Sequence, residues 1–450
     1  MSPVRPHTNV GAVLFLGLML AGALMLTAGS VDAPPACAGV VLPERPASYV
    51  SRSPLSASPA GPGHRGAPHQ EETEPVMEQV QSFIDQSETT ANSALDQGHF
   101  FIQLYGGLQD LLGRTYVEDA DPRYSVVKLS DGTLTFVNSE PMDVTGHGRA
   151  VARLADVLED RDIPLLYVQA PQKLQAEDPR LPDGVEDYGD DYADQVLSVL
   201  KENGVASLDL RETFAATGRP WSSFFFDTDH HWTPEAAFLA YQAISQVLSE
   251  DYGFQIDPAW TDPGSYTRTT YSDYFLGSQG KRVGTLYGGV DDIELWAPTF
   301  KSQFTYSIPI YDMERTGPFE ESLLFPERIE EVDYFNGNPY TLYAGGDYPM
   351  ARIYNEENTG GKRILLLRDS YACALTPFLA LDCGELITID LRYFHDDLLT
   401  YVDWLDPDLV MVMYTAGSVG LEELFSFFPQ ADLAQSLTTA QPPAVQKPDM

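Results

Sequence analysis

The sequence predicts an α/β protein in which a parallel sheet is covered by helices on both faces, together with a mostly β or irregular insertion. Five short apolar runs predict the strands, because strands that are buried on both faces read as continuous apolar segments. Amphipathic stretches lie between most of these runs, which is the pattern of a sheet with helices on both sides. With 450 residues and 43% hydrophobic composition, the chain can bury a large core.

The predicted elements follow one another along the chain. A helical pattern at Arg149–Glu159 precedes the first run, and "YADQVLSVLKENG" precedes the second. The five runs are Ile163–Ala170, Val205–Leu210, Arg363–Leu367, Glu385–Leu391 and Asp408–Tyr414. Ligands of such sheets bind at the carboxyl ends of the strands, so polar residues just after these runs are the first candidates for a functional site.

Changes in composition indicate the domain boundaries. Residues 1–31 contain the uncharged stretch Val10–Ala28, which fits a signal peptide or a signal anchor, since a transmembrane helix needs about 20 apolar residues. Residues 32–75 are rich in Pro, Ser, Ala and Gly and predict a disordered linker, and residues 431–450 predict a disordered tail. The α/β domain spans about 95–430. We therefore expect an extracytoplasmic protein that is anchored to the membrane by its N-terminal segment or secreted.

The insertion at about 252–358 differs in composition from the rest of the domain. It is rich in Tyr, Phe, Thr and Gly and contains turn signals such as "NGNP" and "GGDYP". Its aromatic residues fit the wall of a carbohydrate cleft. They fit equally well a small core that belongs to the insertion itself.

Charge and cysteine content narrow the classes of partner. The net charge of −39 and the sequence pI of about 4.3 oppose binding to nucleic acid. The three cysteines are Cys37, Cys373 and Cys383, and the sequence has no CxxC, so neither a zinc ribbon nor a thioredoxin-like site is predicted. Cys373 and Cys383 either form a disulfide or remain two buried thiols. No cofactor is expected.

The segment "DTDHHWTPEA" is the first candidate site. If "FFFDTDHHW" is extended, Asp227, Asp229 and His231 share one face of the strand, while His230 points the other way. Asp229 then accepts the ring N–H of His231 and orients this histidine as a general base. Two adjacent histidines that point apart cannot easily bind one ion, so no metal is expected.

The same segment also has a purely structural interpretation. Thr233 as N-cap, Pro234 at the first helical position and an acid in the first turn predict a helix start. The histidines can then be surface residues of a capped turn, whereas in the catalytic interpretation Trp232 would close the site.

Ser370 is the candidate nucleophile. It follows the apolar run Arg363–Leu367 and precedes a helical pattern, so it lies at a strand-to-helix turn at the carboxyl end of a strand. The backbone N–H of a residue at this position lies at the positive end of a helix and can stabilise an oxyanion. The alternative is that Asp369 or Ser370 simply caps the helix.

Together, "TDHHWTPEAA", "ILLLRDSYACALTPFLAL" and "ITIDLRYF" resemble the DHHW-motif family of bacterial proteins. That family is related to the SGNH-hydrolase-like domains of alginate O-acetyltransferases. The resemblance covers about residues 100–428, and "GSQGKRVGTLYGGVDD" also fits it. It implies a flavodoxin-like α/β/α domain with Ser370 as nucleophile, His231 as base and Asp229 as the orienting acid.

The resemblance also implies an activity, which is transfer of acetyl to polysaccharide hydroxyls. It implies delivery of the acetyl group by a multi-spanning membrane acyltransferase. The chain departs from the alginate enzymes because no added carbohydrate-binding module follows the α/β domain. We expect an O-acyltransferase that acts on a cell-surface polysaccharide. A carbohydrate acetylesterase with the same triad, and a non-catalytic glycan-binding or assembly protein, are the alternatives.

Five further residues are candidates for binding substrate or an oxyanion. Lys173, Arg392 and Tyr414 stand at or after the carboxyl ends of predicted strands. Cations at these positions can bind an anionic sugar or an oxyanion, and a phenol can donate to the acyl oxygen. Tyr371 and Trp232 adjoin the proposed nucleophile and base.

Overall fold

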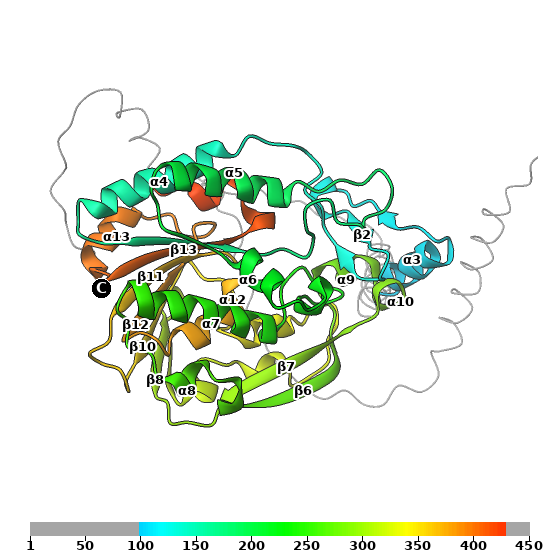
Figure 1. The fold of residues 1–450 in the computed structure, drawn as a ribbon. Helices are drawn as coiled ribbons and strands as arrows, with labels where there is room; N and C mark the ends of the chain where they lie inside the picture. Colours follow the sequence, from blue (N-terminus) through cyan, green and yellow to red (C-terminus); the bar gives the residue numbers. More distant parts are fainter. Residues whose placement is uncertain (1–98, 429–450) are drawn as a thin grey trace, which may run out of the picture. The chain divides into compact units, whose positions relative to one another are not determined.

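The computed structural model describes residues 99–428, and its central element is a sheet of eight strands in the order β5-β4-β13-β11-β12-β10-β8-β9 (Figure 1). Neighbouring strands from β5 to β12 are parallel, whereas β10, β8 and β9 pair in antiparallel fashion. The parallel strands are β4 (Leu165–Ala170), β5 (Ser207–Asp209), β11 (Arg363–Arg368), β12 (Glu385–Ile389) and β13 (Leu409–Thr415). All five predicted strands are present, and the predicted α/β fold class is confirmed.

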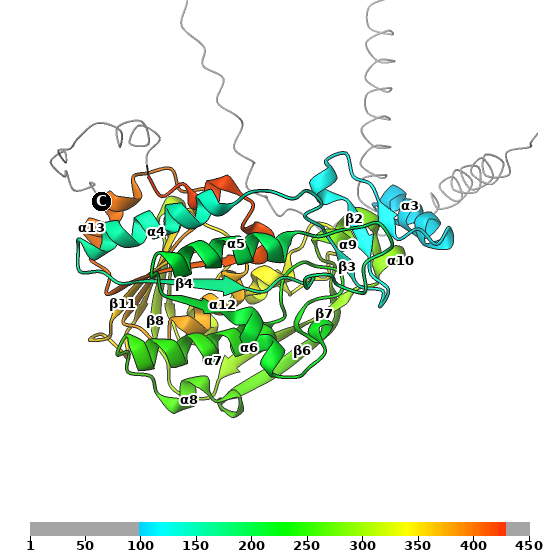
Figure 2. The ribbon, with the colours of Figure 1, turned by 45° about the horizontal axis from the view of Figure 1, so that its top comes forward.

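Helices cover both faces of the sheet (Figures 1 and 2). One face carries α4 (Thr145–Glu159), α5 (Gly189–Glu202) and α13 (Leu398–Leu405), and the other carries α6 (Leu210–Ala216), α7 (Pro234–Asp251) and α12 (Ala372–Leu379). The central strand β11 shows why its sequence is continuously apolar. Ile364 and Leu366 pack on the α7 side, while Leu365 and Leu367 pack on the α4 side.

The region at about 252–358 is divided between two structures. Here β8 (Phe304–Ile308), β9 (Met313–Gly317) and β10 (Met350–Asn355) extend the main sheet, and β6 (Tyr266–Phe275) and β7 (Asp291–Pro298) form a separate antiparallel ribbon. Its short helices are α8 (Pro258–Thr261), α9 (Ser278–Val283), α10 (Thr285–Gly288) and α11 (Phe319–Ser322). Aromatic residues of this region, such as Trp296, Tyr306 and Tyr343, lie in the same hydrophobic core as α7 and β11. These aromatic residues therefore belong to the main core and not to a separate core of the insertion, whereas the cleft wall stays a prediction.

The first described residues lie against α9 and α10 (Figures 1 and 2). They comprise α3 (Phe100–Leu111) and a three-stranded sheet of β1 (Tyr116–Val117), β2 (Val126–Lys128) and β3 (Leu134–Thr135). Gly106 permits the close approach of α3, since a Cβ there would lie 1.6 Å from the carbonyl oxygen of Val283.

Several sequence predictions fall outside residues 99–428, namely those for the segments 1–31, 32–75 and 431–450 and for Cys37. In the described part of the chain, no helix has the length and apolar character that a membrane span requires. Cys373 and Cys383 are both free and buried, so of the two alternatives the structure contains the unpaired thiols.

Candidate active site

The segment that contains the two histidines is a closed loop, and the prediction that it is extended is wrong. Phe225 and Trp232 form an antiparallel bridge, and Phe226 N–H donates to the carbonyl oxygen of His231 at 3.2 Å. The loop bends because the Asp291 carboxylate, at the start of β7, accepts the backbone N–H groups of residues 227 and 228 at 2.5 and 2.8 Å. Asp227 is consequently exposed and does not share the buried environment of Asp229.

The loop nevertheless pairs Asp229 with His231. Asp229 Oδ1 lies 2.5 Å from His231 Nδ1 and also accepts the backbone N–H of His231 at 3.0 Å. Burial opposes ionisation of Asp229, but the neighbouring histidines and the Ser278 N–H outweigh it and hold the pKa of the carboxyl well below its usual range. The ionised carboxylate accepts a hydrogen bond from Nδ1–H, so His231 carries its lone pair on Nε2.

Ser370, 139 residues after His231 in the sequence, lies against the Nε2 lone pair of His231. Its Oγ lies 2.8 Å from His231 Nε2, within the range of a nucleophile–base hydrogen bond. The turn that presents Ser370 is held by the preceding Asp369, whose carboxylate accepts Tyr371 N–H at 3.0 Å and Thr415 N–H at 2.8 Å. Because α12 begins just after this turn, Ser370 lies at the positive end of a helix.

Gly277 and Ser278 complete the support of the acid, and sequence reasoning did not single them out. Ser278 donates to Asp229 Oδ2 through both its backbone N–H, at 2.7 Å, and its hydroxyl, at 2.9 Å. A Cβ on Gly277 would lie 2.2 Å from the Cβ of Asp229, so only glycine fits there. The "GSQG" segment that contains both residues is visible in the sequence, but no sequence pattern indicates that this segment contacts Asp229.

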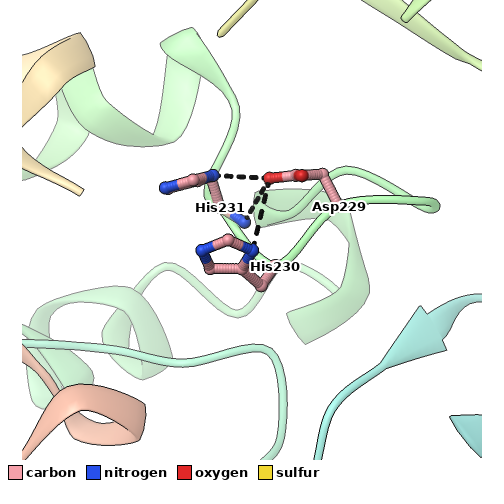
Figure 3. Close-up of side chains that lie close together, drawn as sticks. All are labelled: Asp229, His230 and His231. Carbon is pink, nitrogen blue, oxygen red and sulfur yellow. Dashed lines mark hydrogen bonds and ion pairs between the residues drawn. The ribbon is translucent and has the colours of Figure 1, made fainter. Parts of the chain in front are cut away.

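His230 does not turn away from its neighbour as expected. Its ring lies 3.8 Å from the His231 ring between centroids, and its Nδ1 lies 2.7 Å from Ser278 Oγ (Figure 3). The alternation rule fails because it holds for extended strands, whereas this backbone is bent. Asp229, His230 and His231 thus bring one potential ligand atom each within 4.8 Å of one another. Hydrogen bonds among these residues and Ser278 already use the carboxylate and both Nδ1 atoms.

Two predicted substrate-binding residues are held in the interior, and the roles predicted for them are wrong. Lys173 is buried, and its ammonium donates to the carbonyl oxygen of Leu134 at 2.6 Å, which ties β3 to the region of the histidine loop. Burial lowers the pKa of Lys173 to about 8. Tyr414 packs beneath α4 and α5, and its hydroxyl donates to the carbonyl oxygen of Leu424 at 2.6 Å. Both residues stand at strand ends, as predicted, but their side chains satisfy buried carbonyl groups.

Arg392 is partly exposed and paired with carboxylates. Its guanidinium donates to Asp390 at 2.6 Å and to Asp347 at 3.2 Å, and Asp347 also pairs with the buried Arg368. A substrate-binding role for Arg392 stays a prediction.

Tyr371 and Trp232 form the wall behind the pair of histidines. The Tyr371 hydroxyl donates to the carbonyl oxygen of His230, and its ring centroid lies 5.2 Å from that of His231. Trp232 is fully buried, and its Nε1–H donates to the carbonyl oxygen of Tyr371 at 3.0 Å. Both residues therefore fix the loop to the nucleophile turn.

The described chain is an α/β domain in which Ser370, His231 and Asp229 have the arrangement of a catalytic triad. Residues 135–262 match the family model described as "SGNH hydrolase-like domain, acetyltransferase AlgX". This match confirms the resemblance to SGNH-hydrolase-like domains that the two motifs indicate. No curated protein matches the chain in a sequence comparison.

Solved structures with the same fold include PatB1 from Bacillus cereus, in a form with a sulfonyl adduct. It is 20% identical, with a TM-score of 0.56, and the similarity covers 68% of this chain and 100% of that chain. A DHHW family protein from Eubacterium siraeum is 17% identical, with a TM-score of 0.51, and the coverage is 70% of this chain and 99% of that chain.

Proposed function

We propose that this chain is an extracytoplasmic O-acyltransferase, with acetyl as the transferred group, that modifies a cell-surface polysaccharide through an acyl-enzyme on Ser370. The observation that carries the proposal is the 2.8 Å contact between Ser370 Oγ and His231 Nε2, with Asp229 at 2.5 Å on the other ring nitrogen. A nucleophile, a base and an orienting acid in this order support acyl transfer. The match to a model named for an acetyltransferase favours acetyl.

The first half of the reaction acylates the serine. His231 Nε2 takes the Ser370 proton as Oγ attacks the carbonyl carbon of the acyl donor. The imidazolium is stabilised by Asp229, and the oxyanion forms near the N-terminus of α12, whose dipole favours negative charge. When the intermediate collapses, His231 returns the proton to the leaving group, and the acyl group remains as an ester of Ser370.

The second half transfers the acyl group. A sugar hydroxyl attacks the ester carbonyl while His231 takes its proton, and the proton then passes to Ser370 Oγ as it leaves. The chemistry needs no cofactor. The apolar stretch Val10–Ala28 supports a location outside the cytoplasm, where a multi-spanning membrane acyltransferase would supply the acyl group.

An esterase would use the same acyl-enzyme with water in place of the sugar. The test supplies a chromogenic acetyl ester and a glycan acceptor and measures acetyl gained by the glycan against free acetate. The transferase predicts acetylated glycan, and release of acetate alone would assign the protein as an esterase. Ser370→Ala and His231→Ala should abolish both products, while Ser223→Ala and His395→Ala, at exposed positions, should not. A non-catalytic protein would show no difference among these variants.

A second test follows from the sulfonyl adduct of PatB1. A sulfonyl fluoride should label Ser370 of this chain once, and peptide mass spectrometry should locate the label. His231→Ala should slow the labelling, because the serine then lacks its base.

A further inference from the structure

His230 is the more exposed member of the histidine pair. Its side chain is 38% exposed, whereas that of His231 is 9% exposed. The proposed acyl-transfer steps use only His231. The second ring is therefore accessible to a molecule that enters the site.

Hydrogen-bond donors around Asp229 determine which nitrogen of His230 carries the proton. A carboxylate only accepts, so the Ser278 hydroxyl donates its single proton to Asp229 Oδ2, 2.9 Å away. The Gln279 amide oxygen lies farther from this hydroxyl, at 3.2 Å, and is uncharged. The oxygen of Ser278 must then accept from His230 Nδ1 at 2.7 Å. Nδ1 of His230 therefore carries the proton, and Nε2 carries a lone pair.

His230 is neutral in this arrangement. Partial burial of the ring disfavours its charged form, the adjacent His231 disfavours a second positive charge, and together they lower the pKa of His230 to about 3. Its Nε2 thus remains an acceptor at neutral pH.

The free nitrogen faces the reacting side of the site. In Figure 3 the ring nitrogens of His230 and His231 that do not face Asp229 lie on the same side. On this side His231 Nε2 contacts Ser370 Oγ at 2.8 Å. Among residues 99–428, the hydrogen bond of the His230 ring runs through Nδ1, and no group donates to its Nε2.

We propose that His230 binds the acceptor, with its Nε2 accepting a hydrogen bond from a sugar hydroxyl next to the hydroxyl that His231 deprotonates. The inference rests on the proposed acyl transfer and specifies its substrate class, a glycan whose reacting sugar carries two neighbouring free hydroxyls. Neighbouring ring hydroxyls lie close enough together to reach two imidazole rings whose centroids are 3.8 Å apart. The first hydroxyl would be acylated, and the second would hold the sugar in place.

Two substitutions separate this role from support of the triad. His230→Asn keeps an N–H donor for Ser278 Oγ but ends short of the Nε2 position. His230→Gln places an amide oxygen near the Nε2 position. Each variant is assayed by the burst of chromogenic product, which reports acylation of Ser370, and by the dependence of transfer on glycan concentration.

The acceptor role predicts that His230→Asn raises the KM for the glycan roughly two- to tenfold, as expected for one neutral hydrogen bond, and lowers the burst by a smaller factor than it lowers transfer. His230→Gln should recover part of this loss. With an acceptor that lacks the neighbouring hydroxyl, wild type and His230→Asn should have the same KM, because the two changes remove one interaction. His395→Asn is the matched control on the exposed surface.

Two results would overturn the inference. One is an unchanged KM in His230→Asn, and the other is a burst that falls as much as transfer, which would make His230 a support of the triad only. These two results differ from failure of the proposed acyl transfer, in which the wild-type protein itself acetylates no glycan. In that case the acceptor role of His230 fails together with the proposed function.

Discussion

Asp382 provides a quantitative test of the packing between α7 and the chain that follows α12. Its carboxyl is 1% exposed and accepts hydrogen bonds from the Tyr241 hydroxyl at 2.8 Å and from Ser245 Oγ at 2.5 Å, both on α7. Burial raises the pKa of Asp382 from 3.8 to about 7. The substitution Asp382→Asn keeps the shape of the side chain and removes its charge.

The folded protein holds the proton of Asp382 more tightly than the unfolded chain does. Its contribution to the free energy of unfolding is therefore greatest below the unfolded pKa, falls as the pH rises from 3.8 towards about 7, and stays low above that. The difference of about three pKa units corresponds to about 4 kcal/mol. Asp382→Asn should thus change stability little near pH 4 and raise it by up to about 4 kcal/mol near pH 8.

The assay is urea unfolding at several pH values between these limits, with the midpoint compared between wild type and Asp382→Asn. Asp251→Asn, an exposed acid on α7, is the control and should show no such trend. If the urea midpoints of wild type and Asp382→Asn differed by the same amount at every pH, the raised pKa of Asp382 would be refuted. A gain in stability confined to acid pH would refute it as well.

Three further predictions concern the active site. Gly277→Ala should push Asp229 out of place and lower kcat on the chromogenic ester on the order of 10²-fold. Gly360→Ala is the control, because the added Cβ there meets open space, and it should leave kcat unchanged. Equal kcat values for the two variants would contradict the close contact between Gly277 and Asp229. Asp229→Asn should lower kcat on the order of 10⁴-fold, because the amide no longer favours the reactive tautomer of His231, and a loss under about tenfold would argue against the triad. Tyr414→Phe should cost about 1–3 kcal/mol in unfolding by leaving the carbonyl of Leu424 unsatisfied, with kcat unchanged; a fall in kcat at constant stability would restore its predicted role.

The parallel strands were predictable because burial on both faces leaves a local mark in the sequence. β11 is apolar at every position from Ile364 to Leu367, and each residue packs against one of the two helical layers. The three antiparallel strands β8, β9 and β10 were not assigned to the main sheet. Their pairing depends on where the chain returns to the edge strand, which no local pattern specifies.

The candidate site was predictable in its parts but not in its contacts. Asp229, His231 and Ser370 were identified by residue type and by position at a loop or strand end, and the fold brings them together. The orientation of His230 was missed because Asp291, far along the chain, bends the loop by accepting its N–H groups.

Lys173 and Tyr414 show the limit of reasoning from strand ends. A polar residue at the end of a strand can face the site or turn inward to satisfy a buried carbonyl group, and both of these turn inward. Which direction applies depends on the carbonyl groups that neighbouring segments leave unpaired, and these are set by tertiary packing.

The most direct test of the proposed reaction is to trap the acyl-enzyme. The protein is mixed with a chromogenic acetyl ester, quenched in acid within the burst, digested, and examined by peptide mass spectrometry. We predict one acetyl group on Ser370 in the wild type and none at this position in Ser370→Ala or His231→Ala. An unmodified Ser370 in wild-type protein that releases the chromogenic product, or an equal acetyl signal in His231→Ala, would contradict the Ser–His–Asp mechanism.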